Sequence, residues 1–161
     1  MNVREIAPIV DTDALLAGAQ FVDAFRIEID DMEIDARGVA ERMLVRQPRW
    51  AAALLWLRNF LVTPLGLKTS GASPANPGKT ARDMIGVFPV VSATPDRLIA
   101  GFNDKHLDFR VVVDVTAPGQ IRHVTATTLV LTHNRLGRTY LSVIKPFHRL
   151  IVPALLRQVA N

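Results

Sequence analysis

Hydrophobic and polar residues follow two different periods along the chain, and each period marks one kind of element. Residues 19–30 alternate with a period of two, with Phe25 and Ile27 on one side and Arg26 and Glu28 on the other. Side chains of a strand point alternately to its two faces, so this segment is predicted to be a strand with one buried side.

Two helices are predicted after this strand. Residues 35–45 have an apolar edge at helical spacing, and Asp35 is placed to cap the first turn. The second helix begins after Pro48 and is apolar on all sides. That pattern indicates burial against the domain on one side and a partner on the other, where Trp56 and Phe60 would make the contact.

From residue 85 onward the period of two returns, in four segments joined by short turns. These segments are residues 86–94, 97–104, 105–115 and 121–133. Tight connections join antiparallel neighbours, whereas parallel strands need a long crossover. The second half of the chain is therefore predicted to contain an antiparallel meander.

The last stretch, residues 137–161, predicts one long helix because its apolar positions recur at steps of three and four, as on one helical face. These positions are Leu141, Ile144, His148, Ile151 and Leu155. Gly137 is expected to mark the start of this helix. Pro146 is expected to bend it, because proline removes a backbone donor and crowds the preceding turn.

A strand, two helices, a run of strands and a final long helix together define an α+β fold. We expect a curved antiparallel sheet that grips the long C-terminal helix, with the two helices inserted after the first strand. Residues 1–161 are expected to form a single domain, with a lead-in at 1–18 and a flexible loop at 68–83. Such a curved sheet leaves room for a cavity beneath the helix.

Composition supports a folded domain and excludes several classes of function. Hydrophobic residues make up 49% of the 161 residues and charged residues 21%, as in globular rather than disordered chains. The net charge of +4 is spread out, without the basic run of a nucleic-acid surface. The absence of cysteine excludes disulfides, thiolate metal sites and cysteine nucleophiles.

Location and cofactors follow from three further patterns. Residues 50–67 have the length of a membrane span, but Arg58 at their centre would cost about 2.5–3.5 kcal/mol, so no transmembrane segment is expected. The first residues lack the apolar core of a signal peptide, which favours a cytoplasmic location. The four histidines lack metal-ligand spacing, and the GKT at 78–80 lacks the glycine spacing of a P-loop, so no cofactor is expected.

Five segments carry a resemblance to known proteins. They are LWLRNFLV (55–62), IGVFPV (85–90), DKHLDFRVVV (104–113), NRLGRTYL (134–141) and IKPFHRLIVPALL (144–156). With the order of elements, they make residues 20–158 similar to the START-like, helix-grip (SRPBCC) superfamily of lipid-transfer domains, plant allergen-type carriers and polyketide cyclases. Within it they resemble a bacterial family of unknown function. The resemblance implies a hydrophobic cavity between the sheet and the last helix, and it supplies no catalytic residues.

The leading hypothesis is a binding domain, rather than an enzyme, for a small apolar or amphipathic molecule held in that cavity. The predicted wall consists of Phe109, Val111, Val113, Leu129, Ile144, His148 and Ile151. Arg58, Tyr140 and His148 would supply the polar contacts, because ligand pockets combine apolar walls with a few polar groups.

Two alternatives remain open. The chain has no catalytic motif, but a cyclase or dehydratase-type enzyme could use His148 or His106 as acid or base. Tyr140 or Arg110 would then stabilise a developing oxyanion. The other alternative is a homodimeric interaction module with a filled core, joined through the aromatic residues of the second helix.

Charged residues on two predicted strands also have more than one interpretation. His106, Asp108 and Arg110 share one face of a strand, where they either border a pocket or pair with neighbouring strands on an outer face.

Asp23 falls on the apolar side of the first strand, and a buried charge needs a partner. We expect that partner to be Arg58, which lies in an apolar helix, or Arg138.

Overall fold

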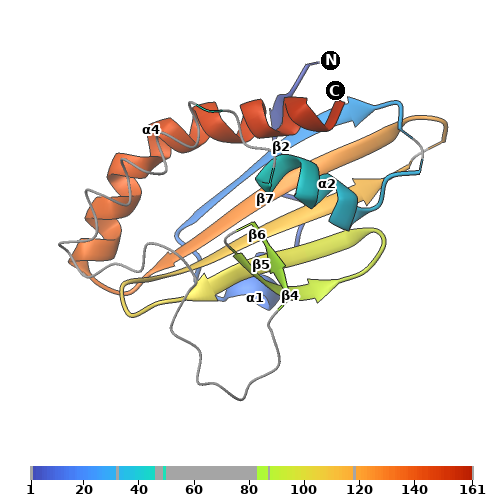
Figure 1. Cartoon of the computed structure of the whole chain (residues 1–161). Coiled ribbons are helices and arrows are strands. Elements are labelled where there is room, and N and C mark those ends of the chain that lie inside the picture. Colours follow the sequence, from blue (N-terminus) through green and yellow to red (C-terminus); the bar gives the residue numbers. More distant parts are fainter. Residues whose placement is uncertain are drawn as a thin grey trace.

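A seven-stranded antiparallel sheet lies between two layers of helices in the computed structural model (Figure 1), which describes residues 2–31, 33–45, 49, 83–86, 88–117 and 119–160. The strand order is β1-β2-β7-β6-β5-β4-β3. The strands are β1 (Arg4–Ile6), β2 (Phe21–Ile29), β3 (Met84–Ile85), β4 (Phe88–Ala93), β5 (Arg97–Asn103), β6 (Leu107–Thr116) and β7 (Arg122–Thr132). The helices are α1 (Thr12–Leu16), α2 (Ala36–Leu44) and α4 (Arg135–Arg157), and a 3-10 turn follows at Gln158–Ala160.

This architecture confirms the predicted α+β fold, with a curved antiparallel sheet and a long C-terminal helix. The helix expected at 35–45 is α2, whose N-cap Asp35 accepts a hydrogen bond from the Gly38 amide at 2.8 Å. The second predicted helix, with Trp56 and Phe60, lies outside the described residues, as does all but the last residue of the loop at 68–83. The lead-in is more regular than expected, since it contains β1, which pairs with β2, and α1.

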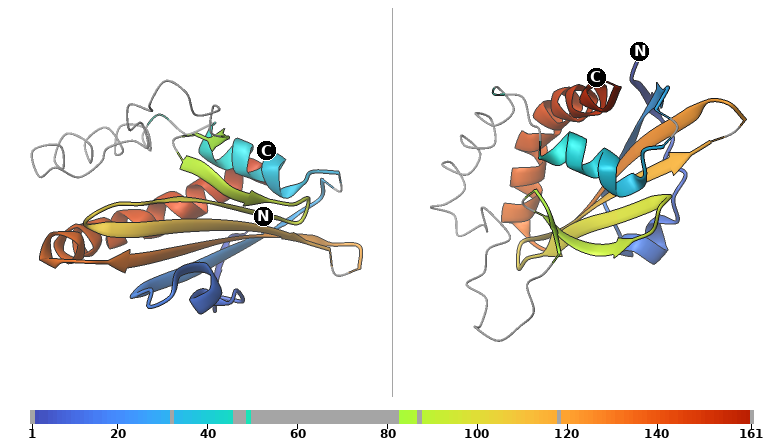
Figure 2. Two further views of the ribbon diagram at one scale, coloured as in Figure 1. Left: turned by 90° about the horizontal axis from the view of Figure 1, so that it is seen from below. Right: turned by 45° about the vertical axis from the view of Figure 1, so that its right-hand side comes forward.

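The two faces of the sheet carry separate cores. On the face toward α2 and α4, Phe25 of β2 lies opposite Ala126 of β7, which lies opposite Val113 of β6. These residues pack with α2 and with the C-terminal part of α4 in the main core. The smaller core on the other face is built on Leu16, Val112 and Leu129. Figure 2 shows α1 on this second side, so the central strands are buried on both faces.

The start of α4 is set by its cap and by a close backbone approach. The helix begins at Arg135, two residues before the expected start, because the Asn134 side chain accepts a hydrogen bond from the Gly137 amide at 2.9 Å. A Cβ atom on Gly137 would lie 2.2 Å from the carbonyl oxygen of His106. Gly137 therefore does not mark the helix boundary; it lets the first turn of α4 rest against the turn before β6.

Pro146 and Pro153 both lie inside α4, and the helix arches along the sheet (Figure 1). Proline bends helices because it lacks the backbone donor and its ring crowds the preceding turn. Pro153 is therefore a second cause of bending in α4, in addition to the expected Pro146. None of the helices within the described ranges is long and apolar enough to cross a membrane.

A matched pair of glycine substitutions tests the close approach at the start of α4. Gly137 and Gly38 occupy the same position, three residues after an Asn or Asp cap. We expect Gly137→Ala to destabilise the protein by about 1–3 kcal/mol, because the new methyl group meets a backbone carbonyl. Thermal unfolding would show a melting temperature several degrees below that of the wild type.

Gly38→Ala is the control, because the atoms nearest to its Cβ would belong to the side chains of Ile34 and Asp35, at 3.0 and 3.2 Å, and not to the backbone. It should change the melting temperature much less than Gly137→Ala does. Equal losses in the two variants would show that the contact with the His106 carbonyl does not limit the position of α4.

Candidate functional site

A charged residue lies on the apolar inner face of the sheet, where β2 passes beneath α4. Asp23 is only 6% exposed, between Phe21 and Phe25 on its own strand and opposite Thr128 of β7. His148 of α4 reaches it, and its Nε2–H donates a hydrogen bond to Asp23 Oδ1 at 3.1 Å. The His148 side chain is 16% exposed, so the pair forms a largely buried link between helix and sheet.

One polar atom on each side of this link remains open to a further interaction. The second carboxylate oxygen, Oδ2 of Asp23, is buried and accepts no hydrogen bond from the described residues. Within the same part of the chain, Nδ1 of His148 has no hydrogen-bond partner either. Buried polar atoms are nearly always satisfied by protein, water or ligand, so Oδ2 is an acceptor that needs a donor beyond the described residues.

Half-buried aromatic rings lie beside this pair and farther across the sheet. Phe21 meets the His148 ring edge-on, with centroids 5.8 Å apart and planes at 81°. On strands β4 to β6, Phe88, Phe102 and Phe109 stack on one another with centroids between 5.2 and 6.3 Å apart. Phe21, Phe102 and Phe109 pack against one apolar cluster, which is built on Leu107, Val130 and Leu141. The aromatic surface therefore extends from Asp23 beneath the N-terminal half of α4.

Part of the predicted cavity wall belongs to this surface. Phe109 is one of the stacked rings, Tyr140 packs against the same apolar cluster, and His148 contacts Asp23. Ile144, on the same helix, is half-buried. Arg58, which was expected to supply a polar contact, lies outside the described residues.

Three other predicted wall residues belong to the main core on the same face of the sheet, and a fourth lies on the opposite face. Val111 and Val113 are 7% and 0% exposed in the main core, and Ile151 packs against that core. The placement of Leu129 on the same wall is wrong, because Leu129 packs with Leu16 and Val112 on the opposite face of the sheet. Strand β7 is buried on both faces, so apolar character alone did not reveal which face Leu129 occupies.

The partner of Asp23 among the described residues is not Arg138, and Arg58, the other arginine expected there, lies outside them. An arginine was predicted, and Arg58 or Arg138 was named; the described partner is His148. Arg138 is exposed on α4 and takes no part in the pair. The sequence contained the relevant signal, because His148 falls in the apolar stripe of the last helix and therefore faces the sheet. Phe21, Phe88 and Phe102, which carry much of the aromatic surface, were not predicted as site residues.

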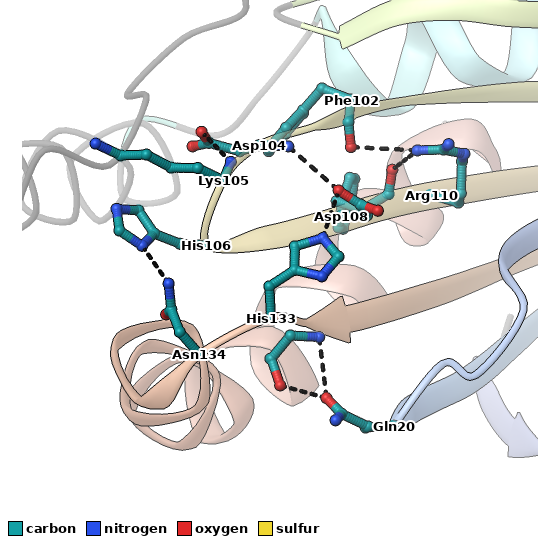
Figure 3. A network of polar contacts seen from close by, with 11 residues as sticks. Gln20, Phe102, Asp104, Lys105, His106, Asp108, Arg110, His133 and Asn134 are labelled. Atoms are coloured by element: carbon teal, nitrogen blue, oxygen red, sulfur yellow. Dashed lines mark hydrogen bonds and ion pairs between the residues drawn. The ribbon is translucent and has the colours of Figure 1, made fainter.

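A second polar group lies where β7 runs into α4 (Figure 3). Nδ2 of Asn134 donates a hydrogen bond to Nδ1 of His106 at 2.8 Å, while Nε2 of His133 donates to Asp108 Oδ1 at 3.0 Å. Arg110 donates to two backbone carbonyl oxygens, at 2.8 and 3.2 Å. His106 therefore supports the cap of α4, apart from Asp108 and Arg110. The Asp108–His133 contact joins β6 to the residue that follows the neighbouring strand β7, which agrees with the outer-face interpretation.

The pKa shifts that are resolved belong to ion pairs away from Asp23 and His148. Hydrogen bonding from the Arg37 guanidinium lowers the pKa of Asp83, and the backbone amide of Glu33, with Arg42, lowers the pKa of Asp31. A carboxyl group with a lowered pKa in the folded state stabilises the fold above its ordinary pKa and loses that contribution as the pH falls through the lowered value. These ion pairs therefore make the stability of the fold decrease in acid, and they take no part in the site around Asp23.

Within the described ranges, no group of three or more His, Asp or Glu residues could hold a metal ion. What the arrangement of Asp23 and His148 offers instead is hydrogen bonding and proton transfer beside an apolar surface.

Comparison with known proteins gives a family but no activity. The family described as "Protein of unknown function (DUF2867)" matches residues 15–155. No protein of curated function matches the chain. Among solved structures, the crystal structure of CalU16 from Micromonospora echinospora is similar at 12% sequence identity and a TM-score of 0.32, covering 86% of this chain and 80% of that one.

A double-mutant cycle tests whether Asp23 depends on His148 for its stability. We expect His148→Leu to cost about 3–5 kcal/mol of unfolding free energy, because it leaves a buried carboxylate unpaired. The double variant Asp23→Val/His148→Leu should be more stable than His148→Leu alone, because it removes that carboxylate. Urea unfolding of the wild type, the two single variants and the double variant gives the four free energies that the cycle needs.

The His133–Asp108 pair is the matched control, with a similar distance of 3.0 Å but a His133 side chain that is 38% exposed. His133→Leu should cost less than about 1 kcal/mol, as for other solvent-exposed pairs. Purely additive effects at Asp23 and His148 would contradict the proposed dependence.

Proposed function

We propose that this chain, which belongs to the DUF2867 family of proteins of unknown function, binds a small amphipathic molecule between its sheet and α4. The single observation that carries this proposal is the buried oxygen Oδ2 of Asp23, which has no donor among the described residues. A bound molecule with an N–H or O–H group would supply the donor.

The surroundings of Asp23 determine what the rest of the molecule must be. Phe21, Phe102 and Phe109 are half-buried rather than fully covered, so a ligand that contacts them removes apolar surface from water. Flat rings also stack favourably on aromatic side chains. The ligand would therefore have a compact apolar or aromatic body.

The polar end of the ligand is constrained by charge. Asp23 Oδ1 already accepts the hydrogen bond from His148, which leaves Oδ2 as an acceptor for an alcohol, a phenol or an amine. A carboxylate at the same point would face a like charge in a buried setting, which is strongly unfavourable. The proposed ligand class is thus a neutral or cationic donor on an apolar body.

This proposal includes the START-like relationship and single-domain organisation indicated by the sequence. The support is the antiparallel sheet with a long C-terminal helix lying across it. In that arrangement, the site between sheet and helix would be formed by one domain. The ligand would contact the N-terminal half of α4, because the C-terminal half packs into the filled main core.

Three naphthalene derivatives with the same apolar body test the ligand class. We expect 2-naphthol and 2-naphthylamine to bind at least about tenfold more tightly than 2-naphthoate, because Asp23 Oδ2 accepts a donor and repels a carboxylate. Naphthalene fluorescence in a titration gives the three dissociation constants.

Asp23→Asn should remove most of this discrimination, because its side chain is uncharged and can itself donate. Asp108→Asn is the control, since Asp108 pairs with His133 away from the aromatic surface. Equal affinity of the wild type for the alcohol and the carboxylate would rule out Asp23 as the polar contact.

A second candidate function is proton transfer at the same site, favoured by the geometry of the His148 ring. Asp23 holds Nε2, and Nδ1 makes no hydrogen bond to the described residues. A carboxylate that orients a histidine in this way fixes its tautomer and stabilises the imidazolium that forms when the other nitrogen takes a proton. His148 would then remove a proton next to a carbonyl group of a bound ketone.

Deuterium exchange of 2-tetralone, followed by NMR in D2O, distinguishes an enzyme from a carrier. An enzyme should accelerate the exchange of its acidic C–H protons by about 10²–10⁴-fold over buffer. His148→Gln should abolish this acceleration, whereas His106→Gln should retain it, because His106 contacts Asn134 instead. If the wild type does not accelerate the exchange, proton transfer is excluded. The binding function would then still be tested by the titration with 2-naphthol.

A further inference from the structure

The outward side of α4 exposes large apolar residues in a regular stripe. Val143, Phe147 and Leu150 are 55%, 41% and 66% exposed. Their spacing of four and three residues places them on one face of the helix, next to the inward face that carries Leu141 and His148. Single exposed apolar residues are ordinary, but a stripe of three along two helical turns marks a contact surface.

The same helix carries positive charge only. From Asn134 to the end of the sequence there are five cations and no Asp or Glu. They are Arg135, Arg138, Lys145, Arg149 and Arg157. The whole chain has 19 Lys and Arg against 15 Asp and Glu, so this one helix accounts for the positive balance of the protein.

Within the part of the chain that the structure describes, these cations form no ion pairs. Arg135, Arg138 and Arg149 are exposed, and none of them joins an ion pair within the described residues. Lys145 contacts the Phe21 ring, with its Nζ 5.2 Å from the centroid. By helical spacing, Arg138 and Arg149 lie on the edge of the exposed side opposite Phe147. The outward side of α4 therefore has an apolar stripe along one edge and guanidinium groups along the other.

We propose that the outward side of α4 docks onto the surface of an anionic lipid membrane. A helix lies in the interface of such a membrane when its apolar residues enter the boundary between headgroups and acyl chains while its cations meet the anionic headgroups. The apolar residues that enter this boundary would be Val143, Phe147 and Leu150, and the cations that meet the headgroups would be the guanidinium groups. A nucleic acid would use the cations and leave the apolar stripe in water.

The shape of the helix fits a membrane better than the groove of another protein. Figure 1 shows α4 arching along the margin of the fold, with its convex side away from the strands. A convex apolar stripe reaches into a soft interface without a complementary groove. This surface is separate from Asp23, so membrane docking does not depend on what binds beneath the helix.

Vesicle sedimentation tests the proposal. The full chain should bind vesicles of phosphatidylcholine with about 30% phosphatidylserine and should bind pure phosphatidylcholine weakly, because each basic residue near an anionic surface strengthens binding about fivefold. Arg138→Gln/Arg149→Gln should therefore weaken binding by about 30-fold and reduce its dependence on salt.

Val143→Gln/Phe147→Gln/Leu150→Gln should abolish vesicle binding while circular dichroism and melting temperature stay near those of the wild type, since these side chains are exposed. The matched control is Val91→Ser/Ile121→Ser, which removes two exposed apolar residues, 58% and 50% exposed, from other parts of the fold and should bind as the wild type does.

Three results would overturn the proposal. They are equal binding of the wild type to both kinds of vesicle, binding to a DNA duplex without binding to anionic vesicles, and a dimer in sedimentation velocity that dissociates in the triple variant without any vesicle binding. The last result would assign the stripe to a second copy of the chain.

Discussion

Asp23 places a carboxylate where the sheet is otherwise apolar, and the position of α4 follows from how that carboxylate is satisfied. His148 can reach Oδ1 only if the helix crosses β2 at one height and turns one face toward it. The same rotation directs Leu141, before His148, and Leu155, after it, into apolar clusters on the sheet. This polar contact thus acts together with the close approach of Gly137 to the His106 carbonyl in fixing the height and rotation of the helix.

The rotation of α4 also determines which residues are exposed on its outward side. Because the helix faces Asp23 with His148, its outward side holds Phe147 and Leu150 along one edge and Arg149 along the other. A turn of the helix by one residue, about 100°, would move a cation toward the core and an apolar residue away from it. A single orientation of the helix therefore determines which residues form the inner site and which form the outer surface.

Local patterns were sufficient for most of the fold. Alternation placed β2, β5, β6 and β7 within a few residues of their positions, and the cap at Asp35 located α2, because these signals act between near neighbours.

Contacts between residues far apart in the sequence were harder to predict. Leu129 was assigned to the wrong face because α1 and its flanking residues cover the second side of the sheet, which removes the polar alternation from β7. Gly137 looked like a boundary, but its role depends on a carbonyl oxygen from the turn before β6, 31 positions earlier in the sequence. The partner of Asp23 lies 125 positions away, so the sequence showed the need for a partner without identifying it.

The two prolines of α4 have a consequence for the path of the helix. Pro146 and Pro153 are seven residues apart, which is nearly two full turns, so both remove a backbone donor from the same side. Two bends on one side reinforce each other and give a simple arc, which keeps both ends of the helix near a curved sheet. Two bends half a turn out of phase would oppose each other and give an S-shaped helix that leaves the sheet at one end. The interval between the prolines, more than the presence of either one, therefore matches the curvature of the helix to that of the sheet.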